Sequence, residues 1–250
     1  MLTSQRRALI TTRLASDGQL VAKALADELG LSEDTIRRDL RDMAADGLLQ
    51  RVHGGALPLQ PPLPDFSERQ TMASAAKRDL GRRAAGMIKP GHLVFLDGGT
   101  TNAEIARALP RNLAVTIATH SPTIAAELVR HAAEVILIGG RLYKHSMVAT
   151  GAATLAAIEA MRPDIFFMGV TALHPAHGLS TGDFEEAAIK RAIAGQSAET
   201  FVAATPEKFG ATSPHRIMPV ERLAGLIVQQ GMDEETLAPY RGMALQVIGA

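Results

Sequence analysis

Residues 32–45, Ser-Glu-Asp-Thr-Ile-Arg-Arg-Asp-Leu-Arg-Asp-Met-Ala-Ala, decide how the first part of this 250-residue chain folds. Ser32 is a good helix N-cap, and the two acidic residues after it favour the positive end of a helix dipole. Apolar side chains then repeat at i, i+4 and i+7, at Ile36, Leu40 and Met43. This spacing predicts a helix over 33–45 with one buried face.

The other face of this predicted helix carries Thr35, Arg37, Arg38 and Arg41. Such a basic and hydroxyl-bearing face suits the groove of a nucleic acid. The acidic residues Glu33, Asp34 and Asp39 are better explained as support for the helix dipole and as groups that orient arginines, because phosphate repels a carboxylate.

Two shorter helices are predicted before this one, over 6–15 and from about 21 to 29, the second ended by Gly30. After Gly47, strand-forming residues surround a glycine pair at 54–55, as in a small β-hairpin that places Arg51 and His53 at its surface. Periodicity alone leaves two interpretations open. One is a winged helix-turn-helix, and the other is a three-helix unit whose arginines are only solvated.

Net charge does not separate these interpretations. The chain has 26 basic and 26 acidic residues, whereas nucleic-acid-binding proteins often have a basic excess. Any nucleic-acid contact must therefore depend on where the charges are placed.

Two short strings, Thr-Ile-Arg-Arg-Asp-Leu at 35–40 and Arg-Val-His-Gly-Gly-Ala at 51–56, resemble the DeoR family of bacterial sugar-metabolism regulators. The resemblance implies that the third helix is the recognition helix and that operator DNA is a partner. It implies contacts to DNA from Ser32, Thr35, Arg37 and Arg38. We expect Arg51 and His53 of the wing to join them.

Four prolines between Leu57 and Phe66 favour an extended spacer and disfavour a helix there. We therefore expect three segments: a winged helix-turn-helix at 1–57, a proline-rich linker at 58–73, and a larger domain at 74–250. That domain is predicted to sense an effector and to form a homo-oligomer.

In the larger domain, apolar strands alternate with helices, which predicts an α/β fold with a mostly parallel sheet covered by helices on both faces. The predicted strands are 93–96, 115–118, 134–138, 165–169, 200–204 and 226–228. The predicted helices are 74–87, 102–109, 122–131, 152–161 and 185–195.

Ligands of such sheets bind beyond the carboxyl ends of the strands. The first strand is followed by Asp97-Gly98-Gly99-Thr100-Thr101, which combines glycines, hydroxyls and a helix N-terminus and so suits a phosphate. The second strand is followed by His120 and Ser121, and the third by Gly140 and a polar loop. Each turn alone also fits an ordinary capped helix or loop, and their convergence favours a small-molecule site.

The same strand-end strings, with Glu185, Lys190 and Lys208, resemble the effector domain of the DeoR family. The resemblance implies a fold related to ribose-5-phosphate isomerase and a phosphorylated sugar or sugar alcohol as effector. His120 stands where the family usually has Asn, and Thr205 where it usually has Asp. The effector and the operator sequence are therefore not identified by the resemblance.

Three alternatives remain open. The kinship with an isomerase allows an enzyme in which Asp97 or Glu185 and Lys190 move protons on a sugar phosphate. His174, His177 and Asp183 allow a metal site, although they occupy a predicted loop and no metal or cofactor is expected. The sheet domain could also serve only to oligomerise the DNA-binding units.

The chain contains no cysteine, which excludes disulfides and thiolate chemistry. Neither a signal-peptide core at the N-terminus nor an apolar run of about 18 residues is found. We expect a cytoplasmic regulator without a membrane partner.

Overall fold

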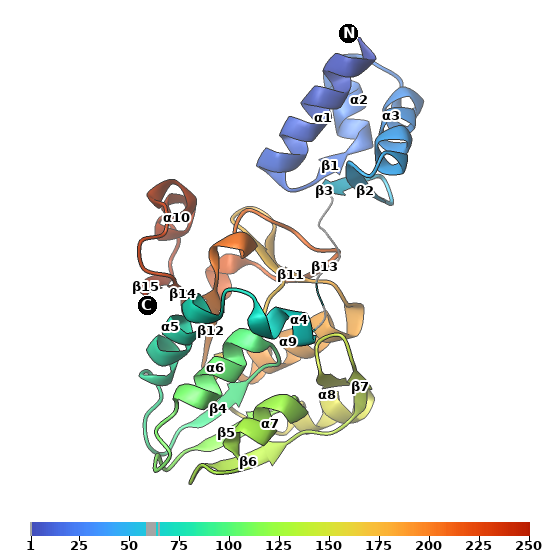
Figure 1. Cartoon of the computed structure of the whole chain (residues 1–250). Helices are drawn as coiled ribbons and strands as arrows, with labels where there is room; N and C mark the ends of the chain where they lie inside the picture. Colours follow the sequence, from blue (N-terminus) through green and yellow to red (C-terminus); the bar gives the residue numbers. More distant parts are fainter. Residues whose placement is uncertain (1, 59–63, 65) are drawn as a thin grey trace.

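The computed structural model describes residues 2–58, 64 and 66–250 (Figure 1). The N-terminal unit contains three helices and a small antiparallel sheet of order β1-β3-β2. Its elements are α1 (Thr3–Asp17), β1 (Leu20–Val21), α2 (Ala22–Leu29), α3 (Glu33–Ala45), β2 (Leu49–Val52) and β3 (Gly55–Pro58). This is the predicted winged helix-turn-helix, and α3 has the predicted bounds.

The three helices pack around one apolar cluster, in which Ile10, Ile36 and Leu40 are almost fully buried. Beside this cluster, Arg6 of α1 donates to Asp39 of α3 over 2.6 Å, and both side chains are nearly buried. Asp39 thus does orient an arginine, as expected, but one on another helix, so it fixes α1 against α3.

The C-terminal unit is built on a seven-stranded, entirely parallel sheet of order β15-β14-β12-β9-β4-β5-β6. The strands are β4 (Leu93–Leu96), β5 (Thr116–Thr119), β6 (Glu134–Leu137), β9 (Ile165–Phe167), β12 (Glu199–Ala204), β14 (Gly225–Val228) and β15 (Gln246–Gly249). The helices are α4 (Phe66–Thr71), α5 (Ser74–Ala85), α6 (Thr100–Ala108), α7 (Pro122–Leu128), α8 (Ala152–Glu159), α9 (Phe184–Gln196) and α10 (Glu234–Arg241). Two 3-10 turns lie at Pro206–Lys208 and Val220–Arg222.

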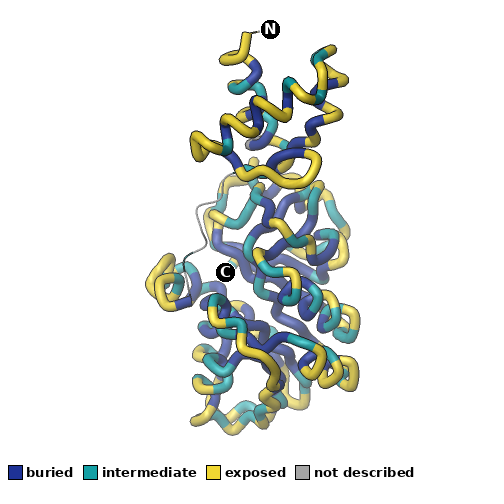
Figure 2. The backbone as a smooth tube through the Cα atoms, turned by 90° about the vertical axis from the view of Figure 1, so that its right-hand side faces the viewer, coloured by how far each residue is buried: buried dark blue, intermediate teal, exposed yellow. Residues whose placement is uncertain are grey.

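Each face of this sheet has its own apolar core, because neighbouring residues of a strand point to opposite faces. Val94 and Leu96 pack with residues of α5, α6 and α7. Phe95 packs on the other side with residues of α8, α9 and α10. The central strands are accordingly buried over most of their length (Figure 2). The predicted parallel sheet with helices on both faces is confirmed.

Several short elements differ from the sequence prediction. Residues 141–146, expected as a polar loop, belong partly to a hairpin of β7 (Arg141–Tyr143) and β8 (Val148–Thr150). A second sheet joins β10 (Ala172–His174), β11 (Gly178–Thr181) and β13 (His215–Met218). These strands have only three or four residues and contain no apolar run of the kind that marks β4, and β13 lies far along the chain from its partner β11.

The predicted linker also contains local structure. Pro61 and Pro62 lie outside the described residues, but residues 66–71 form the helix α4, with Phe66 buried. The prolines all precede this helix and therefore do not interrupt it. In the described ranges, no helix is long and apolar enough to cross a bilayer.

Candidate functional site

The order in which the chain adds strands to the sheet reverses between β4 and β9. The chain runs from β4 outward through β5 and β6, and then returns to the other side of β4 to form β9. Asp97 follows β4 and Gly169 lies just beyond β9, and the Gly169 N–H donates to Asp97 Oδ2 over 2.9 Å. Parallel sheets bind ligands at such a reversal, because the two loops there diverge.

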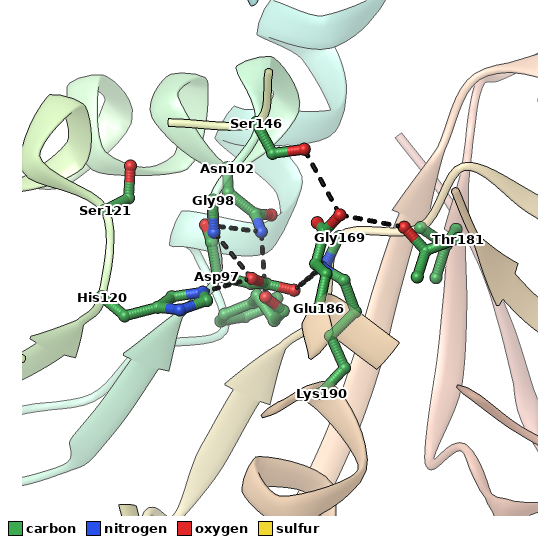
Figure 3. Close-up of polar contacts among 12 residues, drawn as sticks. Asp97, Gly98, Asn102, His120, Ser121, Ser146, Gly169, Thr181, Glu186 and Lys190 are labelled. Atoms are coloured by element: carbon green, nitrogen blue, oxygen red, sulfur yellow. Dashed lines mark hydrogen bonds and ion pairs between the residues drawn. The ribbon is translucent and has the colours of Figure 1, made fainter. Parts of the chain in front are cut away.

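Asp97 is fully buried at this point and accepts four hydrogen bonds (Figure 3). Oδ1 accepts from Gly98 N at 2.8 Å and from His120 Nε2 at 2.7 Å. Oδ2 accepts from Gly169 N and from Lys190 Nζ, the latter at 2.6 Å. Burial alone would raise the pKa of Asp97, but Lys190 and His120 hold that pKa well below its usual range. Asp97 is therefore an anchor for the loops around it.

His120 connects Asp97 to the neighbouring β8. Its Nδ1 lies 2.9 Å from the carbonyl oxygen of Ala149, and its Nε2 faces the Asp97 carboxylate. Both partners accept hydrogen bonds, so the ring links the Asp97 carboxylate to the backbone of β8.

A cavity of about 430 Å³ opens above this network, a volume typical of small-molecule sites. Its lining combines strand-end loops, the start of α6 and part of α4. The lining residues are Pro64, Arg69, Met72, Lys77, Gly98, Gly99, Thr100, Thr101, Asn102, Ser146, Gly169, Val170, Thr171, Thr181, Glu186, Lys190, Ala203, Glu207, Lys208 and Ala211.

Three cations of this lining, Arg69, Lys77 and Lys208, influence one another electrostatically. Burial, together with the charges of Arg69, Lys77 and Lys190, lowers the pKa of Lys208 to about 8, although Glu207 acts in the opposite direction. Burial likewise lowers the pKa of Lys77. An anion near these cations would relieve their mutual repulsion.

A second group in the lining is centred on Glu186. Its Oε2 accepts from Ser146 Oγ at 3.3 Å and from Thr181 Oγ1 at 3.1 Å. Its Oε1 lies 3.1 Å from Lys190 Nζ. Burial alone would lower the pKa of Lys190, but the negative charges of Asp97 and Glu186 raise that pKa above its ordinary value. This group offers hydroxyl and carboxylate oxygens to a polar ligand.

The structure brings six of the eleven predicted effector residues to the cavity wall, namely Gly98, Gly99, Thr100, Thr101, Lys190 and Lys208. Asp97 and His120 lie beneath the wall as described above. Ser121, Gly140 and Glu185 lie outside the lining. Ser121 Oγ donates to the Met147 carbonyl, Gly140 packs closely against Thr154, and half-buried Glu185 forms an ion pair with Arg141.

Ser146 was expected only as part of the polar loop after the third strand, and the sequence prediction did not include Arg69, Lys77, Thr181 or Glu186. One signal was available for Glu186, because it stands four residues before Lys190 and therefore shares its helix face. The others come from the linker helix, from α5 and from the hairpin of β10 and β11, whose position the strand pattern did not reveal.

The N-terminal unit has a basic hollow between α3 and the wing. Its lining contains Arg37, Arg38, Arg41, Arg51 and His53, together with Asp34, Val52 and Gly54. Ser32 caps α3 by accepting from Thr35 N, and the two hydroxyls lie 2.9 Å apart at the start of the same helix. Arg37 forms an ion pair with Glu33 over 2.8 Å. The tertiary structure thus brings the predicted arginines of the helix and of the wing together.

The three residues considered for a metal site do not converge. The rings of His174 and His177 stack at 4.5 Å, whereas Asp183 caps α9 by accepting from Glu186 N at 2.9 Å. Residues 172–174 and 178–181 are strands, so the histidines lie at a hairpin and not in an irregular loop. Among the described residues, no group of three or more His, Cys, Asp or Glu side chains is arranged to hold a metal ion.

Comparisons with known proteins agree with this architecture. A DeoR-like helix-turn-helix domain model matches residues 6–61, and a DeoR C terminal sensor domain model matches residues 72–230. The HTH-type transcriptional regulator GlpR of Haloferax volcanii is 31% identical over 251 residues, which cover 99% of this chain and 98% of that protein. The glycerol-3-phosphate regulon repressor of Escherichia coli K12 is 31% identical over 212 residues, which cover 84% of each chain.

Among solved structures, ribose 5 phosphate isomerase A from Neisseria gonorrhoeae aligns with a TM-score of 0.41 and 14% identity, over 55% of this chain and 54% of that one. The two family models together span both units of the chain. The chain belongs to the DeoR family of helix-turn-helix transcriptional regulators.

Proposed function

We propose that this regulator is a repressor of an operon for sugar or polyol catabolism, and that its C-terminal cavity binds a phosphorylated sugar or polyol. The observation that carries the proposal is the pairing of two kinds of groups in one cavity. Arg69, Lys77 and Lys208 are cations that suit a phosphate, and Ser146, Thr181 and Glu186 are polar groups that suit hydroxyls.

The start of α6 supports the phosphate part of this proposal. Thr100, Thr101 and Asn102 occupy its first turn and line the cavity. The first N–H groups of a helix have no intrahelical acceptor and carry the positive end of the helix dipole. Gly99 before the helix has φ 121°, a conformation that favours glycine and lets the backbone approach a ligand.

We infer that the cavity binds its ligand without catalysing a reaction of it. A general base needs a carboxylate free to accept a proton, whereas Asp97 already accepts four hydrogen bonds and Glu186 is bonded to two hydroxyls and to Lys190. The names of the curated relatives also describe regulators.

For the DNA-binding half, we propose that the hollow of Arg37, Arg38, Arg41, Arg51 and His53 contacts the operator, with Ser32 and Thr35 at the N-terminus of α3. Arginine side chains fit guanine edges and phosphates, and hydroxyls fit phosphates. A homo-oligomer would present two such hollows to repeated half-sites, which sedimentation of the free protein would test.

A thermal-shift screen tests the sensing proposal. Sugar phosphates and polyol phosphates are compared with their unphosphorylated counterparts at equal concentration. We expect only phosphorylated compounds to raise Tm, because ligand that binds the native state stabilises it. Equal shifts from both series would remove the phosphate from the proposal. No shift from either series, with intact DNA binding, would favour a domain that only oligomerises.

Turnover is tested on the same compounds by NMR of the incubated mixture, where a changed carbon skeleton or carbonyl position would show an enzyme. The operator is identified by selecting duplexes from a random pool. Addition of the stabilising phosphate ester should then release the selected DNA.

A further inference from the structure

The end of α1 meets the C-terminal unit through its backbone carbonyls. The helix ends at Asp17, and Gly18 follows in a left-handed conformation with φ 67°. The last carbonyls of a helix have no intrahelical donor and carry its negative end. Here the Gly18 carbonyl accepts from Thr212 Oγ1 over 2.6 Å, and the Asp17 carbonyl accepts from His177 Nε2.

Further contacts hold the turn that carries the donor His177. His174 Nδ1 accepts from the backbone N–H groups of Ala176 and His177, at 3.1 and 3.3 Å, which fixes the turn between β10 and β11. The His174 ring stacks on that of His177. His174 and Thr212 are both buried, so the contact excludes water.

The approach at Gly18 is close enough to depend on glycine. A Cβ atom at this position would lie 2.9 Å from Thr212 Cγ2 and 3.1 Å from His174 Cδ2. We call Thr212, His174 and His177, with the carbonyls of Asp17 and Gly18, the latch.

The same segments that form the latch also form the cavity wall. Thr171 lines the cavity and lies three residues before His174, and Ala211 lines it directly before Thr212. Lys208 Nζ, also in the lining, donates to the Val170 carbonyl over 2.8 Å. Ser213 N donates to Ser180 Oγ of β11 over 2.8 Å. A movement of Lys208 toward a ligand would therefore act on both segments.

We propose that the latch fixes the N-terminal unit on the C-terminal unit and transmits the state of the cavity wall to it. Gly18 lies two residues before β1, which pairs with the wing strand β3, so the latch holds both α1 and the wing. Only the transmission to DNA rests on the proposed function, because the joint itself is a contact within the chain.

The test measures the distance between the two units by electron-electron resonance in the full-length protein without DNA or effector. The chain has no cysteine, so the pair K23C and E159C places one spin label on each unit, and each single variant controls for contacts between copies. We expect one narrow distance distribution. T212V and H177F should each widen it at least twofold, because each removes one donor.

Matched controls are T116V and H92F, which change the same residue types. Thr116 is the first residue of β5 and His92 directly precedes β4, so both lie at the strand ends away from the cavity, and these variants should leave the distance distribution narrow. The latch proposal would be overturned if the parent protein gave a distance distribution as wide as that of T212V. It would also be overturned if T212V and H177F gave distributions as narrow as those of the controls.

The transmission is tested by K208M, and by K208Q should K208M fail to give a cooperative melt. Loss of the Lys208 contact to Val170 should widen the distribution, whereas K144M, an exposed lysine outside the lining, should not. Unchanged width in the Lys208 variants would overturn the transmission. Because no ligand or DNA is used, failure here leaves the proposed function standing, and failure of the ligand screen leaves the latch standing.

Discussion

Lys190 Nζ lies 2.6 Å from Asp97 Oδ2, although the two residues are 93 positions apart and both side chains are almost fully buried. The contact joins α9 to the end of β4 and so fixes the point where the strand order of the sheet reverses. A buried ion pair stabilises only when further hydrogen bonds offset the desolvation of both ions. Asp97 has three other donors, and Lys190 also contacts Glu186.

Replacement of the anchoring carboxylate of Asp97 should destabilise the C-terminal unit. D97N removes the charge that compensates Lys190 and should lower the free energy of unfolding by about 3–5 kcal/mol. Urea unfolding followed by circular dichroism measures the change. The control D79N removes an exposed ion pair with Arg82 and should cost no more than about 1 kcal/mol. Equal losses in the two variants would contradict the role given to Asp97.

The basic hollow of the N-terminal unit should determine the affinity for DNA. R38A should weaken binding to the selected operator by about 5- to 150-fold, since one arginine contact to a base is worth about 1–3 kcal/mol. If Arg51 instead contacts a phosphate, R51A should lose that contact and reduce the salt slope of DNA binding by about 1. Fluorescence anisotropy at several salt concentrations checks both. R130A, an exposed arginine of the C-terminal unit, is the control, and equal losses in R38A and R130A would show a nonspecific charge effect.

Lys208 should distinguish phosphorylated from unphosphorylated ligands. K208M should weaken binding of the effector found by the thermal screen by about 10- to 100-fold, because a charge-assisted hydrogen bond contributes about 1.5–3 kcal/mol. Calorimetric titration of the variant checks this, and operator binding without effector should persist. Unchanged effector affinity would place the phosphate away from Lys208.

Effector binding should weaken in mildly alkaline solution. The pKa of Lys208 is lowered to about 8, mainly by burial, so the ammonium form is lost as the pH rises through this value. A phosphate monoester stays dianionic across this range, since its second pKa is about 6. The Kd should therefore rise from pH 7 to pH 9 in the parent and change less in K208M. A parallel rise in both would assign the titration to another group.

The latch should loosen in mildly acidic solution. Burial and then the charge of His177 lower the pKa of His174, while the Ser16 backbone and Asp17 act in the opposite direction, and Asp17 also lies 3.7 Å from Arg13. The neutral ring is thus favoured in the folded contact. Its stabilisation is complete above the ordinary pKa of about 6.5 and is lost as the pH falls below that value.

Distance distributions at pH 7.5 and pH 5.5 check this expectation, with the lower pH giving the wider one. H174Q, which has no titrating ring, should show the same width at both values. A distribution that narrows at pH 5.5 would contradict the direction derived from the His174 surroundings.

The helix over 33–45, the strand over 93–96 and the α/β class were predictable because they depend on local features: a capping serine, a period of 3.6 residues, and continuous apolar runs. The wing and the strand-end glycines were predictable for similar reasons. These local features, together with two family strings, determined the fold class and the general function from the sequence alone.

The tertiary structure decided which polar residues share a site. Glu186, and not Glu185, faces the cavity, because the phase of α9 is set by how its apolar side packs on the sheet. Arg69 reaches the cavity from a helix within the expected linker. The latch joins residues about 160 to 194 positions apart. Such contacts arise from packing between distant segments, and a single sequence contains no local pattern that encodes them.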